Sequence, residues 1–366
     1  MGQPPDQEAL RLSVVVPFHR NLAHLERCLR AVRTAGQQLP PGQSLVEIIV
    51  VADGARDDPA AVARAAGARV LAIPGPSGPA VARTRGAASA SGNLLVFVDS
   101  DVAVHPDALV RLAGTFDADP GLGAAFGAYD DEPADKGFFS QCRNLAHAFI
   151  HRRSRREART FWAGLGGVRA DVFAAVRGFD ERFTRPSVED IDLGYRLTGA
   201  GFRIALEPRI SGQHLKRWTF ASSVVSDVRD RGVPWTQLIR RYGAMANDLN
   251  ISVRYRLCVV LAYLLAGSLA GGVVAPAAAL AAPVLAAGLW RLDHEYYRFF
   301  IDRRGWLFTL RWFPFHVLHH LCNGLSFVAG NLLFLARRTG LALPWSLPVT
   351  AWPGTTAPGT RVHAHP

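Results

Sequence analysis

The sequence predicts an α/β protein with a mostly parallel open sheet flanked by helices, followed by apolar helices. Four apolar runs, residues 11–18, 46–52, 69–73 and 94–98, are typical of strands buried on both faces of a parallel sheet. Segments of helical character separate these runs, and such alternation favours parallel strands joined by right-handed crossovers. The C-terminal helices are predicted from a long run without a charged residue, 257–290.

Each predicted strand is followed by a predicted helix or loop. Leucines and a valine at helical spacing predict a helix over residues 22–34. An alanine-rich segment predicts a second helix over 58–67, and a Gly/Pro loop at 74–79 leads into a third that ends near Gly92. Residues 120–215 mix glycines, aromatic residues and short apolar runs, and we expect them to complete the same domain.

Charge and composition exclude some functions. The net charge of +11 favours anionic partners such as phosphorylated substrates or acidic lipid surfaces. No zinc-finger or RNP-type pattern is present, so we expect no nucleic-acid partner. The four cysteines are scattered without a CxxC pair, which favours reduced thiols. No secretory signal precedes the first strand, so we expect the N-terminal domain to lie in the cytoplasm.

The uncharged run 257–290 is too long for one straight membrane crossing. As a single helix it would measure about 51 Å, against a hydrocarbon core of about 30 Å. Glycines and Pro276 lie near its middle, and arginines flank both ends. Because arginine-rich flanks prefer the cytoplasm, we interpret the run as a helical hairpin.

Three further segments complete the C-terminal region. Residues 216–256 combine arginines with aromatic residues, which suits a membrane interface. Residues 312–336 form a third candidate span, although a single outward crossing would leave Arg337 and Arg338 outside, so a re-entrant or tilted segment is the alternative. The Pro/Gly-rich tail 341–366 is predicted to be poorly ordered.

Acidic residues follow two of the predicted strands. Asp99-Ser100-Asp101 comes directly after the fourth strand and Asp53 after the second, at the sheet edge where ligands bind. Mg²⁺ and Mn²⁺ take carboxylate oxygens and can neutralise a diphosphate leaving group. Asp53 can accept a pyrimidine N–H or a ribose hydroxyl, and the loop 75–86 places backbone N–H groups where they can meet phosphate. The alternatives are turn-forming acids and a solvated loop.

A second acidic cluster lies in SVEDIDLGYRL. A displacement at an anomeric carbon needs a base to take the acceptor's proton, and Glu189 and Asp190 are candidates. Asp192 lies two residues beyond Asp190 and points elsewhere on a helix, where it can pair with Arg196. The alternative is an acidic first helical turn favoured by the helix dipole.

Histidines and arginines give weaker signals. His214 follows an apparent strand and is either a third metal ligand or a surface residue. His316, His319 and His320 have metal-ligand spacing, but no acid lies near them in the sequence, so we interpret them as interfacial histidines. The basic run 151–159 is either a solvated helix face or a contact for anionic lipid or a lipid-linked phosphate.

Taken together, the motifs over residues 11–215 resemble the family 2 glycosyltransferases with the GT-A fold. The resemblance is carried, in the family's order, by SVVVPFHRN (13–21), VADGARD (51–57), GPAVARTRGAASASGNLLVFVDSD (78–101), GFDERF (178–183), VEDIDLGYRLTGAGFRIALEP (188–208) and His214.

The resemblance implies a direct, inverting displacement on a nucleoside-diphosphate sugar, with Mg²⁺ or Mn²⁺ as the cofactor. It implies that Asp190 is the catalytic base, supported by Glu189. Nucleotide and donor binding is implied for Pro17, Asp53, Arg83, Asp99 and Ser100, and metal binding for Asp99, Asp101 and His214.

The uncharged C-terminal segments resemble those of membrane-bound members that act on lipid-linked or glycan acceptors. We therefore expect a multi-pass protein of the cytoplasmic membrane whose catalytic domain faces the cytoplasm and contacts membrane lipids. The expected organisation is a catalytic domain at 1–215, an interface segment at 216–256, transmembrane helices at 257–340 and the tail.

Some residues depart from the family pattern. The family often has two adjacent acids where this chain has Ala52-Asp53, and Thr84 stands where Asn is common. QHLKRW (213–218) has one residue too many for the QxxRW element, which disfavours long-chain processive synthesis. A nucleotidyltransferase and a non-catalytic membrane scaffold are the competing hypotheses, and the presence of the metal and base aspartates argues against the scaffold.

Overall fold

The computed structural model describes residues 9–243, 252–341, 343 and 347. It divides into two compact units. Within the described residues, the first unit comprises residues 9–134 and 155–216, and the second comprises residues 135–154, 217–243, 252–341, 343 and 347. The first unit ends at Lys216, one residue after the boundary of 215 that the sequence predicts. Residues 135–154 lie within that range but belong to the second unit.

A single nine-stranded sheet forms the centre of the first unit, in the order β3-β2-β1-β4-β8-β6-β9-β5, with β7 paired to β9. The strands are β1 Leu10–Phe18, β2 Gln43–Asp53, β3 Arg69–Ile73, β4 Leu94–Val98, β5 Val102–Val104, β6 Leu122–Tyr129, β7 Glu157–Ala158, β8 Leu165–Arg169 and β9 Arg203–His214. All four predicted strands are confirmed.

The sheet is mixed, which corrects the expectation of a mostly parallel one. The first four strands pair in parallel, as do β6 and β9. However, β8 runs antiparallel to both β4 and β6, and β5 and β7 run antiparallel to β9. Between β6 and β8 the chain passes through residues 135–154, which belong to the second unit, so β6 and β8 are not joined by a helix of the first unit and need not run parallel.

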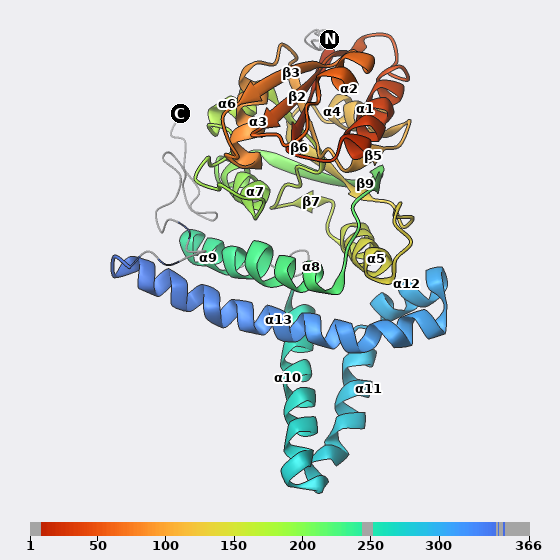
Figure 1. The fold of residues 1–366 in the computed structure, drawn as a ribbon, viewed down its shortest axis with the longest axis vertical. Coiled ribbons are helices and arrows are strands. Elements are labelled where there is room, and N and C mark those ends of the chain that lie inside the picture. The colour runs from red at the N-terminus through yellow and green to blue at the C-terminus, as the bar shows by residue number, and fades with distance from the viewer. Residues whose placement is uncertain (1–8, 244–251, 342, 344–346, 348–366) are drawn as a thin grey trace, which may run out of the picture. The chain divides into compact units, whose positions relative to one another are not determined.

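Helices flank this sheet (Figure 1). They are α1 Leu22–Gly36, α2 Ala60–Ala65, α3 Pro79–Ala88, α4 Ala108–Ala118, α6 Ala170–Ala175 and α7 Glu189–Gly199. The three helices predicted between the first four strands are confirmed. The helix α1 buries Leu25, Leu29 and Val32 completely, and the Asn21 side chain accepts the His24 N–H at its start.

The parallel strands bring two predicted acids to one edge of the sheet. Asp53 is the last residue of β2, and Asp99 directly follows β4. Because β2, β1 and β4 run in the same direction, their carboxyl ends open at the same edge. These strands are largely apolar, and Val14, Val50 and Val96 are fully buried. The two acidic residues therefore lie at the ends of the strands, at this edge of the sheet.

The second unit is helical. Its elements are α5 Phe138–Arg153, α8 Phe220–Val225, a π-helix Ser226–Gly232, α9 Val233–Tyr242, α10 Val253–Val274, a 3₁₀ helix Pro276–Ala281, α11 Ala282–Leu292, α12 His294–Arg304 and α13 Trp306–Arg338. Two of these helices, α10 and α13, are long and apolar enough to cross a membrane.

The run 257–290 folds as a helical hairpin of α10 and α11, with the turn at Pro276–Ala281 (Figure 1). A Cβ on Gly272 would lie only 2.7 Å from the Cβ of Ala279, so a glycine allows the close turn. The expected third span 312–336 lies inside α13, which runs crosswise to the hairpin in Figure 1. The hairpin and α13 therefore cannot both lie along a membrane normal. Most of the predicted tail lies outside the described residues.

Candidate functional site

Asp53 holds the loop that begins α3. Its Oδ1 accepts the N–H of Ser77 at 2.7 Å, and its Oδ2 accepts the N–H of Gly78 at 2.7 Å. Gly54 has a φ of +49°, and a Cβ there would lie 2.4 Å from the carbonyl carbon of Gly75, so only glycine allows this approach of two backbones. Asp53 thus has a structural partner on each oxygen, and its contact with a nucleoside stays a prediction.

The Asp99-Ser100-Asp101 segment forms a tight turn between β4 and β5. The N–H of Val102 donates to the Asp99 carbonyl at 2.9 Å, and the N–H of Asp99 donates to the Gly164 carbonyl at 3.1 Å. The side chains of Asp99 and Asp101 are 30% and 29% exposed, so both carboxylates can reach a ligand. Ser100 and Pro17, the latter near the end of β1, are half-buried beside this edge.

His214 closes this turn from the end of β9. Its Nε2 lies 3.7 Å from Oδ2 of Asp101, longer than a hydrogen bond, while the N–H of Leu215 donates to the Asp101 carbonyl at 2.8 Å. The imidazole stacks on Tyr129, with ring centroids 4.2 Å apart. Burial opposes ionisation of Asp101, but His214, Lys216 and His24 outweigh it and lower the pKa of that carboxyl.

Arg83 links the two acidic motifs. It lies on α3, is almost fully buried, and donates from one guanidinium nitrogen to Asp99 at 2.6 Å and from another to Glu189 at 2.8 Å. Its guanidinium also lies over the ring of Phe179, 5.5 Å from the centroid. Arg83 therefore joins α3, the turn after β4 and the start of α7, and its direct contact with a nucleoside stays a prediction.

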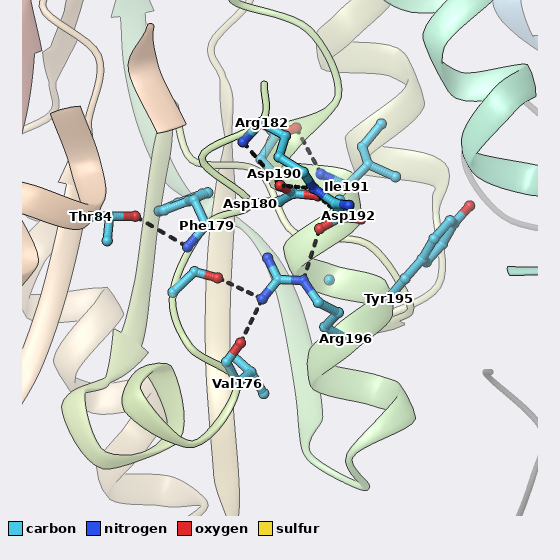
Figure 2. A network of polar contacts seen from close by, with 12 residues as sticks. Thr84, Val176, Phe179, Asp180, Arg182, Asp190, Ile191, Asp192, Tyr195 and Arg196 are labelled. Atoms are coloured by element: carbon cyan, nitrogen blue, oxygen red, sulfur yellow. Dashed lines mark hydrogen bonds and ion pairs between the residues drawn. The ribbon is translucent and has the colours of Figure 1, made fainter. Parts of the chain in front are cut away.

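The acids of α7 point in different directions, as their spacing predicts. Glu189 turns to Arg83 and accepts the Ser187 N–H at 2.8 Å. Asp192 is fully buried and pairs with Arg196 at 2.8 Å. Arg196 also donates to the carbonyls of Val176 and, at 2.5 Å, Gly178, as Figure 2 shows for the labelled partners. Asp192 and Arg196 therefore hold residues 176–178, at the start of GFDERF, against α7.

Asp190 is the acid of α7 that forms no ion pair with an arginine among the described residues. Its oxygens accept the N–H of Ile191 at 2.8 Å and, weakly, that of Ala163 at 3.3 Å. Burial and the neighbouring charge of Glu189 raise the pKa of Asp190 to about 7, and Arg83 opposes this shift. A carboxylate with a pKa near neutrality can exchange a proton at physiological pH, which is what a general base needs.

The sequence analysis missed the role of the segment 161–164. Its residues contact both motifs, because Gly164 binds the Asp99 N–H and Ala163 binds Asp190. The ring of Trp162 packs edge-on against Tyr129, with centroids 4.8 Å apart. The signal in the sequence was Gly194 within the acidic helix motif, because a Cβ there would lie 2.4 Å from the Phe161 nitrogen and would prevent the close approach of α7 to this segment.

The site has an excess of negative charge. Four acids gather here, Asp99, Asp101, Glu189 and Asp190, and Arg83 is the arginine that acts on them among the described residues. Burial and the charges of Asp101 and Glu189 raise the pKa of Asp99 despite its pairing with Arg83. Such an arrangement of carboxylates with one imidazole fits a hard divalent cation.

The interpretation of the C-terminal histidines is partly wrong, because acids do lie near them in space. His319 Nδ1 is 2.7 Å from Oδ2 of Asp227, and His316 Nε2 is 3.9 Å from Oδ2 of Asp293. Asp227 comes from the π-helix and Asp293 from the junction of α11 and α12, both distant in sequence. His316 and His320 are therefore part of the packed interior of the second unit, whereas His319 is partly exposed.

Comparisons with known proteins indicate the family that the chain resembles. Residues 13–178 match the family model described as Glycosyl transferase family 2. No curated protein matches the chain. The match covers β1 to the segment before GFDERF and therefore includes the turn after β4 and Arg83.

A solved structure shares the fold. The mannosyltransferase PcManGT from Pyrobaculum calidifontis, in complex with GDP-Man and Mn²⁺, aligns over 90% of this chain and 88% of its own, with a TM-score of 0.51 and 13% identity. GalNAc-T7 with UDP, GalNAc and Mn²⁺ aligns over 58% of this chain and 44% of its own, with a TM-score of 0.43 and 16% identity. The predicted GT-A fold and the resemblance to family 2 are confirmed.

Proposed function

Because residues 13–178 match the family model described as Glycosyl transferase family 2, we propose that this protein is an inverting, metal-dependent hexosyltransferase. It moves a sugar from a nucleoside-diphosphate donor to a hydroxyl or phosphate of a lipid-linked or glycan acceptor at the cytoplasmic face of the membrane. The observation that carries the proposal is the Arg83 bridge between Asp99 and Glu189. This bridge joins Asp99, a proposed metal ligand, to Glu189, the neighbour of the proposed base Asp190.

The donor binds at the carboxyl ends of β1, β2 and β4. Pro17, Asp53 and Ser100 surround this edge, and Asp53 fixes the backbone of the loop at 77–78. In this proposal Asp53 acts on the nucleoside partly through that loop, and Arg83 acts by positioning Asp99. The N–H groups at the start of α3 favour a diphosphate.

Asp99, Asp101 and His214 would hold Mg²⁺ or Mn²⁺. The separation of 3.7 Å between His214 and Asp101 leaves room for both to bind one ion, and the surplus of carboxylates provides the charge. When bound, the cation would neutralise negative charge that develops on the diphosphate leaving group. Tyr129, stacked on His214, holds the imidazole in a fixed plane.

Asp190 acts as the base. Its raised pKa follows from burial and from Glu189, so Glu189 supports the reaction by its charge and by holding Arg83. The proton of the acceptor hydroxyl passes to a carboxylate oxygen of Asp190 as the hydroxyl oxygen attacks the anomeric carbon and the nucleoside diphosphate leaves. One displacement of this kind inverts the anomeric configuration.

The second unit is proposed to associate with membrane lipids. The helix α10 has 22 residues, about 33 Å, which matches a hydrocarbon core of about 30 Å. At the hairpin turn, Val273, Val274 and Leu280 are strongly exposed and no charged residue is present. We place the hairpin in the membrane and the crosswise helix α13 along its surface (Figure 1).

A basic cavity in the same unit suits anionic lipid. The cavity, of about 410 Å³, is lined by residues of α5 and α12. Four of them are arginines, against two acids, and they are Arg152, Arg153, Arg298 and Arg303. Arginine forks bind phosphate groups well, so this cavity supports contact with a lipid head group.

Nucleotide binding tests the central proposal. Calorimetry with UDP, GDP and dTDP, with and without Mn²⁺, should show metal-dependent binding of one nucleotide to the full-length protein and its loss in Asp101→Ala. The control is Asp107→Ala, an acid of the same region that is 51% exposed and pairs only with a surface arginine. Absence of nucleotide binding with and without metal would reject the proposal in favour of a scaffold.

Vesicle flotation tests the membrane proposal. The full-length protein should float with vesicles that contain anionic lipid, and the variant Val274→Asp/Leu280→Asp should float much less, because a charge in hydrocarbon is costly. Val46→Asp, at an exposed valine of the catalytic unit, is the matched control. If Val274→Asp/Leu280→Asp floated with the vesicles as well as Val46→Asp does, insertion of the hairpin into the membrane would be contradicted.

A further inference from the structure

Three buried side chains that can bind metal meet inside the second unit. They are Cys258 on α10, Asp293 at the junction of α11 and α12, and His320 on α13. Their ligand atoms all lie within 4.8 Å of one another, and none of the three residues is more than 1% exposed. Residues from three separate parts of the helical unit thus converge on one point.

The buried side-chain atoms of Asp293 and His320 lack hydrogen-bond partners among the described residues. Both carboxylate oxygens of Asp293 and both ring nitrogens of His320 have no hydrogen-bond partner within the described part of the chain. Arg254 approaches Asp293 only to 3.5 Å and also faces Glu295. Because a buried, unpaired carboxylate or imidazole costs free energy, the arrangement calls for a further group that binds these atoms.

A second histidine completes the set. His316 lies one helical turn before His320, is 2% exposed, and has its Nε2 3.9 Å from Oδ2 of Asp293. Its Nδ1 is 2.9 Å from the hydroxyl of Tyr297. When Nδ1 donates its proton to that hydroxyl, the lone pair of Nε2 faces Asp293. A hydrogen bond of this kind orients histidines that bind metals.

We propose that Cys258, Asp293, His316 and His320 form a structural zinc site. One thiolate, one carboxylate and two imidazoles match the donor types and the four-coordinate geometry of closed zinc sites. A tetrahedral zinc site separates its ligand atoms by about 3.3–3.8 Å, so small side-chain rotations would bring these atoms to binding distance. The thiolate distinguishes the site from the oxygen-rich cluster of the catalytic unit, which suits a harder ion.

The zinc would tie the base of the hairpin to α13. Cys258 lies in the second turn of α10, Asp293 directly follows α11, and both histidines come from α13. One ion therefore fixes both arms of the hairpin and the crosswise helix. This role does not depend on the proposed glycosyl transfer.

Metal analysis of full-length protein without a histidine tag, purified in detergent and dialysed against metal-free buffer after zinc addition, tests the site. We expect about one zinc per chain in the wild type and its loss in Cys258→Ser and His320→Gln. Cys322→Ser is the matched control, because Cys322 is also buried and lies on α13. Asp101→Ala should keep the zinc while it loses nucleotide binding, which separates this site from the catalytic one.

Cobalt substitution provides a readout that does not require a stable variant. Co²⁺ added to the metal-free wild type should give the sulfur-to-cobalt charge-transfer absorption of a thiolate ligand, and Cys322→Ser should give the same spectrum. Removal of the metal should lower the melting temperature by about 5 °C or more. No zinc in the wild type, no thiolate-to-cobalt absorption, or equal zinc loss in Cys258→Ser and Cys322→Ser would overturn the proposal.

Discussion

The two compact units each bury a cluster of titratable side chains, and they stabilise these clusters differently. In the catalytic unit, Arg83 donates to Asp99 and Glu189 at 2.6 and 2.8 Å. In the helical unit, Asp293 and His320 have no hydrogen-bond partner among the described residues. The first cluster is held by its own side chains, whereas the second fits an added ion.

This difference separates structural charges from charges that can act on a ligand. Within the catalytic unit, Arg83 and Arg196 each neutralise buried acids, so those acids position helices and turns. Asp101 and Asp190 form no ion pair with an arginine among the described residues. Asp101 lies next to His214, and Asp190 accepts the N–H of Ala163. Glu189 and Asp192 therefore form a structural frame, Asp99 is held by Arg83 while its carboxylate stays accessible, and Asp101 and Asp190 are the acids without such a pair.

The largest effect on stability is expected when Arg83, the cation that pairs with Asp99 and Glu189, is replaced. Arg83→Met leaves the buried Glu189 and the partly exposed Asp99 without their cation, and we expect a loss of about 3–5 kcal/mol in the free energy of unfolding. Arg85→Met, on the same helix, removes a 59% exposed arginine 3.6 Å from Glu181 and should cost less than about 1 kcal/mol. Denaturant unfolding measures both, and similar losses would show that Arg83 is not a structural centre.

A comparable effect, on activity instead of stability, is expected for the base. Asp190→Asn should lower kcat about 10²–10⁴-fold, because the amide cannot accept the acceptor's proton, with little change in melting temperature. Asp192→Asn should do the reverse and weaken the fold, because it breaks a fully buried pair with Arg196. Steady-state kinetics and thermal unfolding of both variants separate the two roles, and an active Asp190→Asn enzyme would remove Asp190 as the base.

The pH dependence of activity gives a smaller, graded effect. The deprotonated form of Asp190 is the active base, and its pKa is raised to about 7 by burial and by Glu189. The kcat should therefore be constant above about pH 8 and fall about tenfold per unit below pH 7. In Glu189→Gln the midpoint should move to lower pH, because a charge that raises the pKa is gone. An unchanged midpoint in a folded variant would contradict this coupling.

The smallest effect concerns a paired acid far from the site. Glu47 accepts from Ser13, from the backbone and side chain of Ser91, and from Arg69. Burial opposes its ionisation, but these bonds, first those of Ser91, lower the pKa of Glu47 to about 2. Because the folded pKa lies below the unfolded value, the stabilisation is complete above about pH 4.5 and is lost as the pH falls toward 2.

Glu47→Gln should therefore cost about 2 kcal/mol at pH 7, and the difference from wild type should vanish near pH 2. Glu26→Gln is the control, since Glu26 is 57% exposed and forms only a surface pair with Arg30. Unfolding at several pH values measures both, and a constant difference for Glu47→Gln across this range would exclude the ionised carboxylate as the cause.

The local periodicity of the sequence predicted the first four strands and the helices between them. Strands such as LLVFV are apolar at each position because both faces are covered. This pattern can be recognised without knowing which elements pack against the strand. The direction of β8 could not be predicted in this way, because it depends on where the chain returns to the sheet after residues 135–154. Strand direction is a property of the connection and not of the strand's own residues.

The candidate site shows the same division. The sequence by itself determined that acids follow β2 and β4 and open α7, because strand ends and helix starts are local features. Only the tertiary structure decided that Arg83 joins Asp99 to Glu189 and that Cys258, Asp293 and His320 meet, because these contacts bridge long stretches of chain. A local pattern tells which face of an element is buried. Which charges become neighbours depends on packing between elements that are distant in sequence.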